Sequence, residues 1–468
     1  MPDFDVLIVG GGPGGYVAAI RAAQLGLKTA LVEKEAVGGV CLNWGCIPSK
    51  ALLHSADLAN EFRRAADYGI GYDNLRLDLG VAVDRSRQVA EKMVGGVETL
   101  LQQNKVTVVK GTAKLAGGTR VMVAPAGETI EAANLVIATG GVTRSLPNVP
   151  IDGDRVLTSR EALELRETPR SVVIVGGGPI GAEFGYLYRT YGAEVTIVEM
   201  LDRVLPNEDA DVSRAVERAF KDQGMAIHTG TKVESIKTGE GGVTVTVSAG
   251  DKRQELVAER CLIGVGFGPN TAGLGVEEAG IATERGWLKV DDHARTNVPN
   301  VYAIGDVTGL LLLAHVASHQ GVTAVETIAG QEPPPLDYAK MPRAVYCAPQ
   351  VASLGLTEAE ARERGHRVRV GRFPFRANGK ALAIGETEGF VKLVADEDSG
   401  DILGYHIVGP NATEAIAEAS LGAVLETTPA ELGFAVHAHP TLAEAVKEAA
   451  LAVRGNSVHF YAPLRQAR

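Results

Sequence analysis

The chain of 468 residues contains only four cysteines, no basic block and no long apolar run. So few cysteines exclude a secreted fold held together by disulfides, and a close pair then favours redox chemistry or metal binding. Lysine and arginine are scattered among acids at a formal charge of −11, which argues against nucleic-acid binding and is compatible with a basic protein partner. No run reaches the ~20 apolar residues of a membrane span, and an apolar strand begins at Phe4. We therefore expect a cytoplasmic protein without a leader peptide or membrane span.

The first motif is a βαβ unit near the start of the chain. Its parts are the strand Val6–Val9, glycines Gly10, Gly12 and Gly15, an alanine-rich helix through Leu25, and the strand Thr29–Glu33. In a dinucleotide fingerprint the first glycine permits a tight turn, the second lets a pyrophosphate approach the backbone, and the third lets the helix pack on the strand. Glu33 falls where a ribose would lie. A generic tight turn would explain the glycines, but not the strand, helix and acid together.

The same pattern recurs in the middle of the chain. Its parts are the strand Ser171–Val175, glycines Gly176, Gly178 and Gly181, a helix through Tyr191, and the strand Glu194–Glu199. Two fingerprints imply two dinucleotides. Glu199 should accept hydrogen bonds from a ribose diol and repel a 2′-phosphate, which favours NAD over NADP. Arg203 lies close enough to reach a phosphate, although a solvated side chain is the simpler interpretation.

A pair of cysteines follows the first fingerprint. Between Gly38 and Lys50 the chain reads Gly-Gly-Val-Cys-Leu-Asn-Trp-Gly-Cys-Ile-Pro-Ser-Lys. On a regular helix the Cα atoms of Cys41 and Cys46 would lie roughly 8–9 Å apart, whereas a disulfide needs less than about 7 Å. Gly45 and Pro48 suit a loop or distorted first turn. We therefore predict a reducible disulfide. A metal site is disfavoured because no second ligand pair accompanies these thiols, and we predict no metal; Cys261 and Cys347 read as buried small side chains.

Further strands end in small or acidic residues. Asn134–Gly141 reads as a buried strand, and so does Asn300–Asp306, whose Asp306 either caps the next helix or holds a sugar hydroxyl. Glu332–Pro335 marks a linker. The chain from 341 onward reads as a separate α+β domain, with strands such as Phe390–Val394 and helices such as Ala412–Leu425.

Two further groups of residues, one basic and one of histidines, have ordinary structural interpretations. The basic residues between Arg362 and Arg372 are interrupted by Glu363, Gly365 and valines, and should form a helix end and a strand face rather than a docking site. Six histidines lack ligand-like spacing and are expected at the surface or at strand ends: His54, His228, His293, His366, His406 and His459.

These motifs, in this order, give the whole chain a resemblance to the dihydrolipoyl dehydrogenases, a branch of the FAD-containing pyridine nucleotide–disulfide oxidoreductases. The cysteine segment resembles their redox motif, Ala138-Thr139-Gly140 and Gly305-Asp306 their second FAD-binding patches, and His437-Ala-His439-Pro-Thr-Leu-Ala-Glu444 their acid–base motif. The resemblance implies an α/β fold with two Rossmann-like domains and a C-terminal α+β dimerisation domain. It divides the chain into an FAD-binding domain (1–148 and 271–340), an NAD-binding domain (149–270) and an interface domain (341–468).

The resemblance also implies residue roles. Cys41 would exchange with the substrate sulfur and Cys46 would lie against the flavin, with Lys50 paired to Glu183 nearby. His439, oriented by Glu444, would act as the base in the opposite subunit of a homodimer. The remaining cofactor contacts would include Glu33 at the FAD adenosine ribose and Asp306 at its ribityl or phosphate region, together with Thr139, Gly140, Ala314 and Gly266.

Taken alone, two of these groups have structural readings: Lys50 as a surface lysine and His439 as a helix cap. We place Pro440 at a first helical position, so that Glu444 follows about one turn later. His437 is the rival base, disfavoured because no acid stands at matching distance in the sequence. Phe267, Val316 and His319 depart from the family pattern and bear on NAD affinity and the flavin environment.

The expected reaction is oxidation of protein-bound dihydrolipoamide to lipoamide with reduction of NAD⁺. Expected partners are lipoyl domains and the subunit-binding domain of a 2-oxo acid dehydrogenase complex, or the lipoyl protein of glycine cleavage. Mercuric reductases carry a terminal thiol pair that Val458–Arg468 lacks, and Glu199 argues against an NADPH-dependent glutathione-type reductase. A non-catalytic flavoprotein scaffold would bind FAD without dithiol–NAD turnover.

Overall fold

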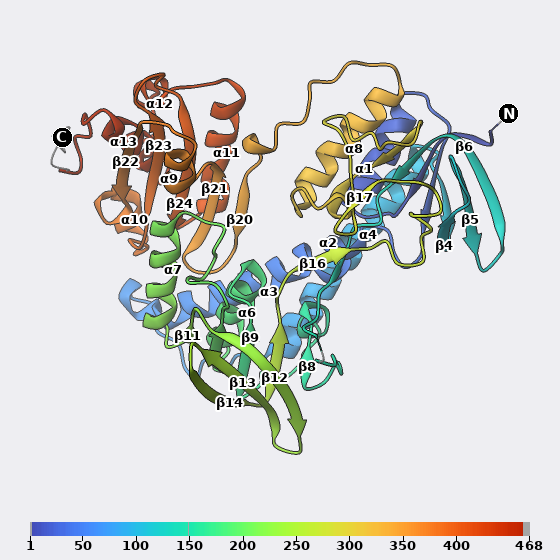
Figure 1. Cartoon of the computed structure of the whole chain (residues 1–468). Helices are drawn as coiled ribbons and strands as arrows, with labels where there is room; N and C mark the ends of the chain where they lie inside the picture. The colour runs from blue at the N-terminus through green and yellow to red at the C-terminus, as the bar shows by residue number, and fades with distance from the viewer. Residues whose placement is uncertain (1, 148, 462–468) are drawn as a thin grey trace.

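The computed structural model describes residues 2–147 and 149–461, so part of the tail 458–468 lies outside the described residues (Figure 1). A seven-stranded sheet forms the first unit in the order β3-β2-β1-β6-β5-β4, with β19 paired to β6. Its strands are β1 (Phe4–Val9), β2 (Thr29–Glu33), β3 (Thr107–Lys110), β4 (Thr112–Leu115), β5 (Arg120–Ala124), β6 (Glu128–Ile137) and β19 (Val301–Ala303). Because β19 pairs parallel to β6, the chain beyond 300 returns to the first sheet.

The helices of this unit carry the cysteine segment. They are α1 (Pro13–Gln24), α2 (Gly39–Trp44), α3 (Cys46–Arg63), α4 (Leu79–Gln103) and α8 (Ala314–Ile328), with short 3₁₀ turns η1 (Ala65–Tyr68) and η2 (Gly305–Thr308). Helix α8 packs along α1, and α3 packs against both α4 and the helix of the second glycine turn. The long helix α3 therefore runs from the cysteines of the first unit to the second unit.

The second unit contains a parallel sheet in the order β11-β10-β9-β15-β8. Its strands are β8 (Val156–Leu157), β9 (Ser171–Val175), β10 (Glu194–Val198), β11 (Ala226–His228) and β15 (Arg260–Ile263), and its helices are α5 (Ser159–Ala162), α6 (Pro179–Thr190) and α7 (Ala210–Asp222). An antiparallel sheet lies beside it, formed by β12 (Lys232–Gly239), β13 (Gly242–Ala249) and β14 (Lys252–Ala258). Two small pairs complete this region, β7 (Gly141–Thr143) with β16 (Phe267–Pro269), and β17 (Thr283–Glu284) with β18 (Trp287–Leu288).

The third unit is an antiparallel sheet in the order β20-β21-β24-β23-β22. Its strands are β20 (Arg343–Val345), β21 (Gln350–Gly355), β22 (Val368–Pro374), β23 (Phe390–Asp396) and β24 (Ile402–Gly409). Its helices are α9 (Glu358–Glu363), α10 (Gly379–Ala383), α11 (Ala412–Val424), α12 (Pro429–Phe434) and α13 (Glu444–Val453), with η3 (Tyr338–Lys340) and η4 (Phe375–Ala377). In Figure 1 this unit lies far from the first sheet, at the other side of the molecule.

The two βαβ units are confirmed, and β2 and β9 have the predicted bounds. Two predicted strands differ from the observed ones by more than two residues at an end. The strand predicted over 300–306 is only β19, because Asn300 adopts the left-handed region (φ 62°) and η2 begins at Gly305. The strand predicted over 134–141 begins earlier, at Glu128, because its first half pairs antiparallel with β5, and it ends at Ile137.

Burial confirms that Cys261 and Cys347 are core residues, with at most 1% of either exposed. The prediction for His406 is wrong: it lies inside β24, fully buried, and its Nε2 donates to the Leu356 carbonyl at 2.9 Å. This contact satisfies one ring nitrogen, while Nδ1 is buried without a hydrogen-bond partner. In the described part of the chain no helix combines the length and apolarity of a membrane span.

Candidate active site

The first glycine turn lies between β1 and α1, and its outer and middle glycines differ in how much space surrounds them. A Cβ atom on Gly10 (φ 105°) would lie 2.2 Å from the Ala138 carbonyl oxygen, and one on Gly15 would lie 1.8 Å from the Gly10 carbonyl oxygen. A Cβ on Gly12 would meet nothing closer than Gly39 Cα at 4.0 Å. The outer glycines are therefore required by the fold, while the middle one presents bare backbone to open space.

The second turn shows the same difference between its outer and middle glycines. A Cβ on Gly176 (φ 109°) would lie 2.4 Å from the Gly264 carbonyl oxygen, and one on Gly181 would lie 1.9 Å from the Gly176 carbonyl oxygen. A Cβ on Gly178 would meet nothing within 4 Å. Each turn thus leaves its middle glycine open at the amino end of a helix, where unpaired N–H groups favour a phosphate.

Glu33 and Glu199, the two acids at strand ends, accept hydrogen bonds from the backbone of these turns. The Glu33 carboxylate accepts hydrogen bonds from the Gly11 and Glu35 amides, both at 2.7 Å. Each carboxylate oxygen keeps a second acceptor direction. A ribose hydroxyl could therefore bond Glu33 without displacing the turn.

Glu199 makes the same contacts in the second unit, accepting from Gly177 N at 2.7 Å and Leu201 N at 2.8 Å. It is 8% exposed. Arg203 forms an ion pair with its neighbour Asp202 at 2.9 Å. Its guanidinium is thus already engaged by an acid, with 37% of the Arg203 side chain exposed.

One cavity of about 1540 Å³ connects both turns. Its lining includes the two middle glycines, both strand-end acids and the further predicted cofactor residues Thr139, Gly140, Asp306, Ala314 and Gly266. Thr139 Oγ1 is buried without a hydrogen-bond partner, and burial raises the pKa of Asp306 to about 6. Open glycine backbone, an unpaired hydroxyl and acids at strand ends are the groups that a large dinucleotide such as FAD would satisfy, so these residues fit it.

Cys41 and Cys46 also line this cavity. Cys41 lies in α2, Cys46 begins α3, and Gly45 breaks the helix between them with φ −145° and ψ −113°. The predicted distortion is therefore confirmed, and Pro48 lies in the first turn of α3, where no donor is needed. Both cysteines are free thiols in the structure, so the predicted disulfide is not formed in it.

The two thiols differ in acidity. Hydrogen bonding from the Cys41 thiol lowers the pKa of Cys46, against burial and with further help from the Lys50 ammonium. The same hydrogen bond, together with burial, raises the pKa of Cys41. These contacts favour a thiolate at Cys46 over one at Cys41.

Lys50 and Glu183 meet as predicted. Lys50 Nζ lies 2.9 Å from both carboxylate oxygens of Glu183, and Glu183 also accepts from Tyr346 N at 3.0 Å. The Lys50 ammonium lies 4.7 Å from the centroid of the Tyr346 ring. Sequence reasoning missed Tyr346 because a backbone donor from a distant strand leaves no residue-type signal.

His439 and Glu444 also meet, with His439 Nδ1 2.9 Å from Glu444 Oε1. Thr441 N donates to the other carboxylate oxygen at 2.8 Å. The prediction that Pro440 begins the helix is wrong, since α13 begins at Glu444. The acid is brought to the imidazole by the bend that precedes the helix, rather than by one helical turn.

His437 also has a carboxylate partner, contrary to the prediction. His437 Nε2 lies 2.9 Å from Glu418 Oε1, and Glu418 comes from α11 rather than from the local sequence. His437 therefore has an acid of its own. The two imidazoles differ in exposure, because 9% of the His437 side chain and 77% of the His439 side chain is accessible.

Within one chain, the His439–Glu444 pair lies away from Cys41 and Cys46. The described residues that line the cavity include neither His439 nor Glu444, and Figure 1 shows α12 and α13 far from α2. Large apolar side chains are exposed on this face of the third unit: Leu421, Val424, Leu425, Phe434 and Val436. An accessible imidazole beside an uncovered apolar face is suited to contact with another subunit.

The three departures from the family pattern lie in different surroundings. Phe267, in β16, is paired with Thr143 and lines the cavity. Val316 is fully buried in α8, and His319 is exposed on the same helix. Of the three, Phe267 is the one that lines the cavity.

The surroundings of His293 differ from the prediction that it lacks ligand-like neighbours. The ligand atoms of Asp291, Asp292 and His293 lie within 4.8 Å of one another, so His293 does have ligand-like neighbours. His293 Nδ1 is bonded to Asp292 at 2.8 Å and its Nε2 to the Pro333 carbonyl at 3.2 Å. These contacts account for the imidazole without an ion.

The comparisons with known proteins decide the family. Residues 4–321 match the pyridine nucleotide-disulphide oxidoreductases, and residues 341–450 match the dimerisation domain of the same family. This chain belongs to the pyridine nucleotide–disulphide oxidoreductase family. Its C-terminal unit is accordingly a dimerisation domain, which explains the exposed apolar face and supports a homodimer.

Relatives and solved structures agree. The dihydrolipoyl dehydrogenase of Mycobacterium tuberculosis H37Rv is 50% identical over 466 residues, covering 98% of this chain and 100% of the relative. That of Bacillus subtilis is 45% identical, covering 98% and 99%. The crystal structure of LpdA from Mycobacterium tuberculosis superposes with a TM-score of 0.88 at 31% identity, covering 95% and 98%. The flavoprotein disulfide reductase RclA from Escherichia coli, as its Cu(II) complex, gives 0.85 at 28%, covering 96% and 99%.

Proposed function

We propose that this protein is a dihydrolipoyl dehydrogenase, which oxidises protein-bound dihydrolipoamide to lipoamide and reduces NAD⁺. The observation that carries the proposal is the half-buried pair Cys41 and Cys46, which lines one cavity with both glycine turns. Relatives that cover the chain end to end carry this name. Overall, dihydrolipoamide and NAD⁺ yield lipoamide, NADH and one proton.

In the oxidised enzyme Cys41 and Cys46 form a disulfide. A substrate thiolate attacks the Cys41 sulfur, the sulfur–sulfur bond breaks, and Cys46 leaves as a thiolate. The second substrate sulfur then attacks the sulfur bonded to Cys41, which releases lipoamide and leaves two reduced cysteines. The lowered pKa of Cys46 makes it the better leaving group.

The substrate thiols must lose protons before they attack, because only thiolates are competent nucleophiles. His439 of the partner subunit is the base. Its Nδ1 is bonded to a carboxylate, so Nε2 faces outward to take the proton, and the Glu444 charge stabilises the imidazolium. His437 is less suited because its Nε2 is already bonded to Glu418.

FAD fits the first turn, where the residues that would hold it are Gly12, Glu33, Thr139, Asp306 and the amino end of α8 at Ala314. When bound, FAD supplies a two-electron relay between the reduced cysteines and NAD⁺. Lys50, fixed by Glu183, places a positive charge beside Cys46 and would stabilise negative charge on a bound flavin.

NAD⁺ fits the second turn, where Gly178 would face its pyrophosphate and Glu199 its adenosine ribose. We accordingly assign 1–148 and 271–340 to FAD binding, 149–270 to NAD binding and 341–468 to the interface. The net charge of −11 suits a basic subunit-binding domain as the partner that docks the dimer onto a lipoyl-bearing complex.

The test is a spectrophotometric assay of the purified protein with dihydrolipoamide and NAD⁺, following NADH. We expect a yellow protein that produces NADH with dihydrolipoamide and NAD⁺, and much less with NADP⁺. A protein with bound FAD but no dithiol–NAD turnover would instead be a scaffold, and turnover only from NADPH toward another disulfide would make it a reductase of the glutathione type.

A further inference from the structure

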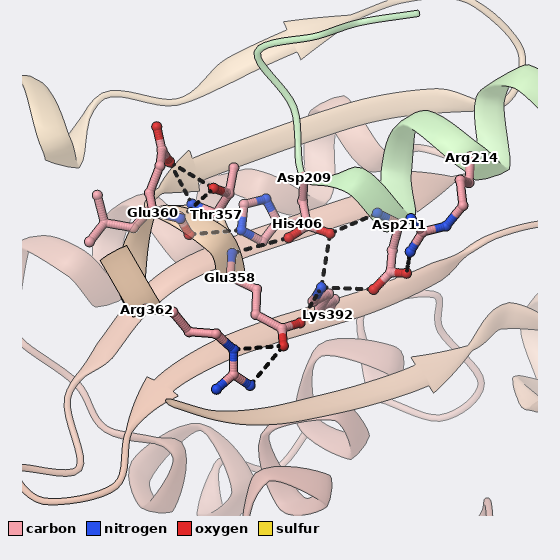
Figure 2. Close-up of polar contacts among 10 residues, drawn as sticks. Asp209, Asp211, Arg214, Thr357, Glu358, Glu360, Arg362, Lys392 and His406 are labelled. Carbon is pink, nitrogen blue, oxygen red and sulfur yellow. Dashed lines mark hydrogen bonds and ion pairs between the residues drawn. The ribbon is translucent and has the colours of Figure 1, made fainter. Parts of the chain in front are cut away.

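A buried cluster of charges joins the second unit to the dimerisation domain. Lys392 on β23 has only 2% of its side chain exposed, and its Nζ lies 2.9 Å from Asp209, 2.7 Å from Asp211 and 2.8 Å from Glu358. Figure 2 shows the ammonium between these three carboxylates, with α7 on one side and the dimerisation sheet beneath. Arg214 pairs with Asp211 and Arg362 with Glu358, so the outer acids have partners of their own.

Asp209 belongs to the second unit and makes contacts both within that unit and with the dimerisation domain. It is the N-cap of α7, accepting from Asp211 N at 2.9 Å, and it also accepts from Glu358 N at 3.1 Å across the junction. Its side chain is 3% exposed, so it depends on Lys392 for compensation of its charge. A buried carboxylate that lost this cation would be strongly unfavourable.

From Asp209 a short series of contacts leads to the second glycine turn. Ser213, one turn into α7 and 1% exposed, donates from Oγ to the Leu205 carbonyl at 3.1 Å. Leu205 N in turn donates to the Gly177 carbonyl at 2.8 Å. Gly177 stands between the first and middle glycines of the turn.

The loop that carries Leu205 is strained. Leu205 has φ 47°, a left-handed conformation that costs a leucine energy and persists only where the surroundings fix it. The loop residues that line the cavity are Met200, Leu201, Leu205, Pro206, Asn207 and Glu208. Glu208 is bonded to Arg343 of the dimerisation domain at 3.2 Å, a second tie across the same junction.

We propose that Lys392 is a positioning residue for NAD⁺: by anchoring Asp209 it holds the loop 200–209, and thereby the second glycine turn, in the shape that accepts the dinucleotide. This inference rests on the proposed function, because it takes the second turn as the NAD⁺ site. Lys392 itself lies outside the cavity lining. Its effect should therefore fall on NAD⁺ binding and leave the cysteine chemistry unchanged.

The test compares the FAD-loaded dimer with its Lys392→Met variant, which keeps most of the side-chain length and removes the charge. We expect the KM and the equilibrium dissociation constant for NAD⁺ to rise roughly tenfold, the effect of losing about one charge-assisted hydrogen bond at the turn. The kcat at saturating NAD⁺, the FAD content and the rate of flavin reduction by dihydrolipoamide without NAD⁺ should stay within about twofold.

Two further variants sharpen the test. Ser213→Ala removes only the contact to the Leu205 carbonyl, and it should raise the KM for NAD⁺ roughly fivefold, as expected for one neutral hydrogen bond. In the double variant the two effects should combine to less than their product, because both act through the same loop. Lys221→Met is the matched control: it breaks the exposed pair with Glu217 on the same helix and should change nothing.

Unchanged NAD⁺ affinity in folded, FAD-loaded Lys392→Met would overturn the inference, and so would an equal loss in flavin reduction by the dithiol. If that variant does not fold, unchanged affinity in Ser213→Ala overturns it instead. Absence of dithiol–NAD turnover in the wild type would refute the proposed function, whereas the NAD⁺ binding titration would still test the role of Lys392.

Discussion

Replacement of Gly178 by alanine separates cofactor binding from folding. The backbone at Gly178 is extended (φ −75°, ψ −169°), a conformation open to alanine, and its added Cβ would meet nothing within 4 Å. The unliganded protein should therefore accommodate the methyl group at a cost below about 1 kcal/mol, the difference between glycine and alanine at an N-cap. With NAD⁺ present, the methyl group would occupy the space through which the pyrophosphate approaches the backbone.

The magnitude follows from the contacts that the methyl group prevents. A hydrogen bond to a charged group contributes about 1.5–3 kcal/mol, and each 1.4 kcal/mol corresponds to about tenfold in affinity. Loss of one such bond should thus raise the KM for NAD⁺ by roughly 10- to 100-fold. Initial rates at varied NAD⁺ and saturating dihydrolipoamide measure this, and thermal unfolding and FAD content serve as controls.

Gly181→Ala is the matched comparison. Its Cβ would lie 1.9 Å from the Gly176 carbonyl oxygen, so the backbone must shift. Overpacking of this kind costs about 1–3 kcal/mol, and we expect a lower Tm for Gly181→Ala together with weaker NAD⁺ binding. If Gly178→Ala left the KM for NAD⁺ unchanged, or lost as much stability as Gly181→Ala, the assignment of the middle glycine to the pyrophosphate would be refuted.

The other predictions concern the thiols, the base and nucleotide choice. His439→Gln should collapse dithiol oxidation while flavin binding and NADH oxidation by artificial acceptors persist; undiminished dithiol turnover would remove it as the base. Cys46→Ser should abolish the long-wavelength absorption of the two-electron-reduced enzyme, and survival of that band would reverse the thiol assignment. Because the pKa of Cys46 is lowered, by the Cys41 thiol first and Lys50 next, its thiolate persists as the pH falls to that pKa. Lys50→Met should therefore shift the acid loss of the band to higher pH, and an unchanged titration midpoint would contradict the role of the ammonium. Glu199→Ala should relax discrimination against NADP⁺, measured as the ratio of kcat/KM for the two nucleotides; an unchanged ratio would place the selectivity elsewhere.

Two predictions about the C-terminal histidine segment are wrong, for different physical reasons. Pro440 was expected to begin a helix, but α13 begins at Glu444, and the acid still reaches His439. Around His437 the neighbouring sequence offers no acid at matching distance, whereas Glu418 reaches this histidine from α11. Contacts between elements distant in the sequence depend on packing, which local patterns do not record.

The sequence by itself determined the two βαβ units, their open glycines and the kinked cysteine pair. Steric rules for a few consecutive residues set these features: no side chain fits at Gly15 or Gly181, and Gly45 interrupts the helix between the thiols. Only the tertiary structure decided that both units share one cavity and that Glu418 reaches His437 from a distant helix. It also decided that Lys392 is buried among carboxylates from two units. Burial and pairing of charges depend on which surfaces meet, and that is fixed only when the whole chain has packed.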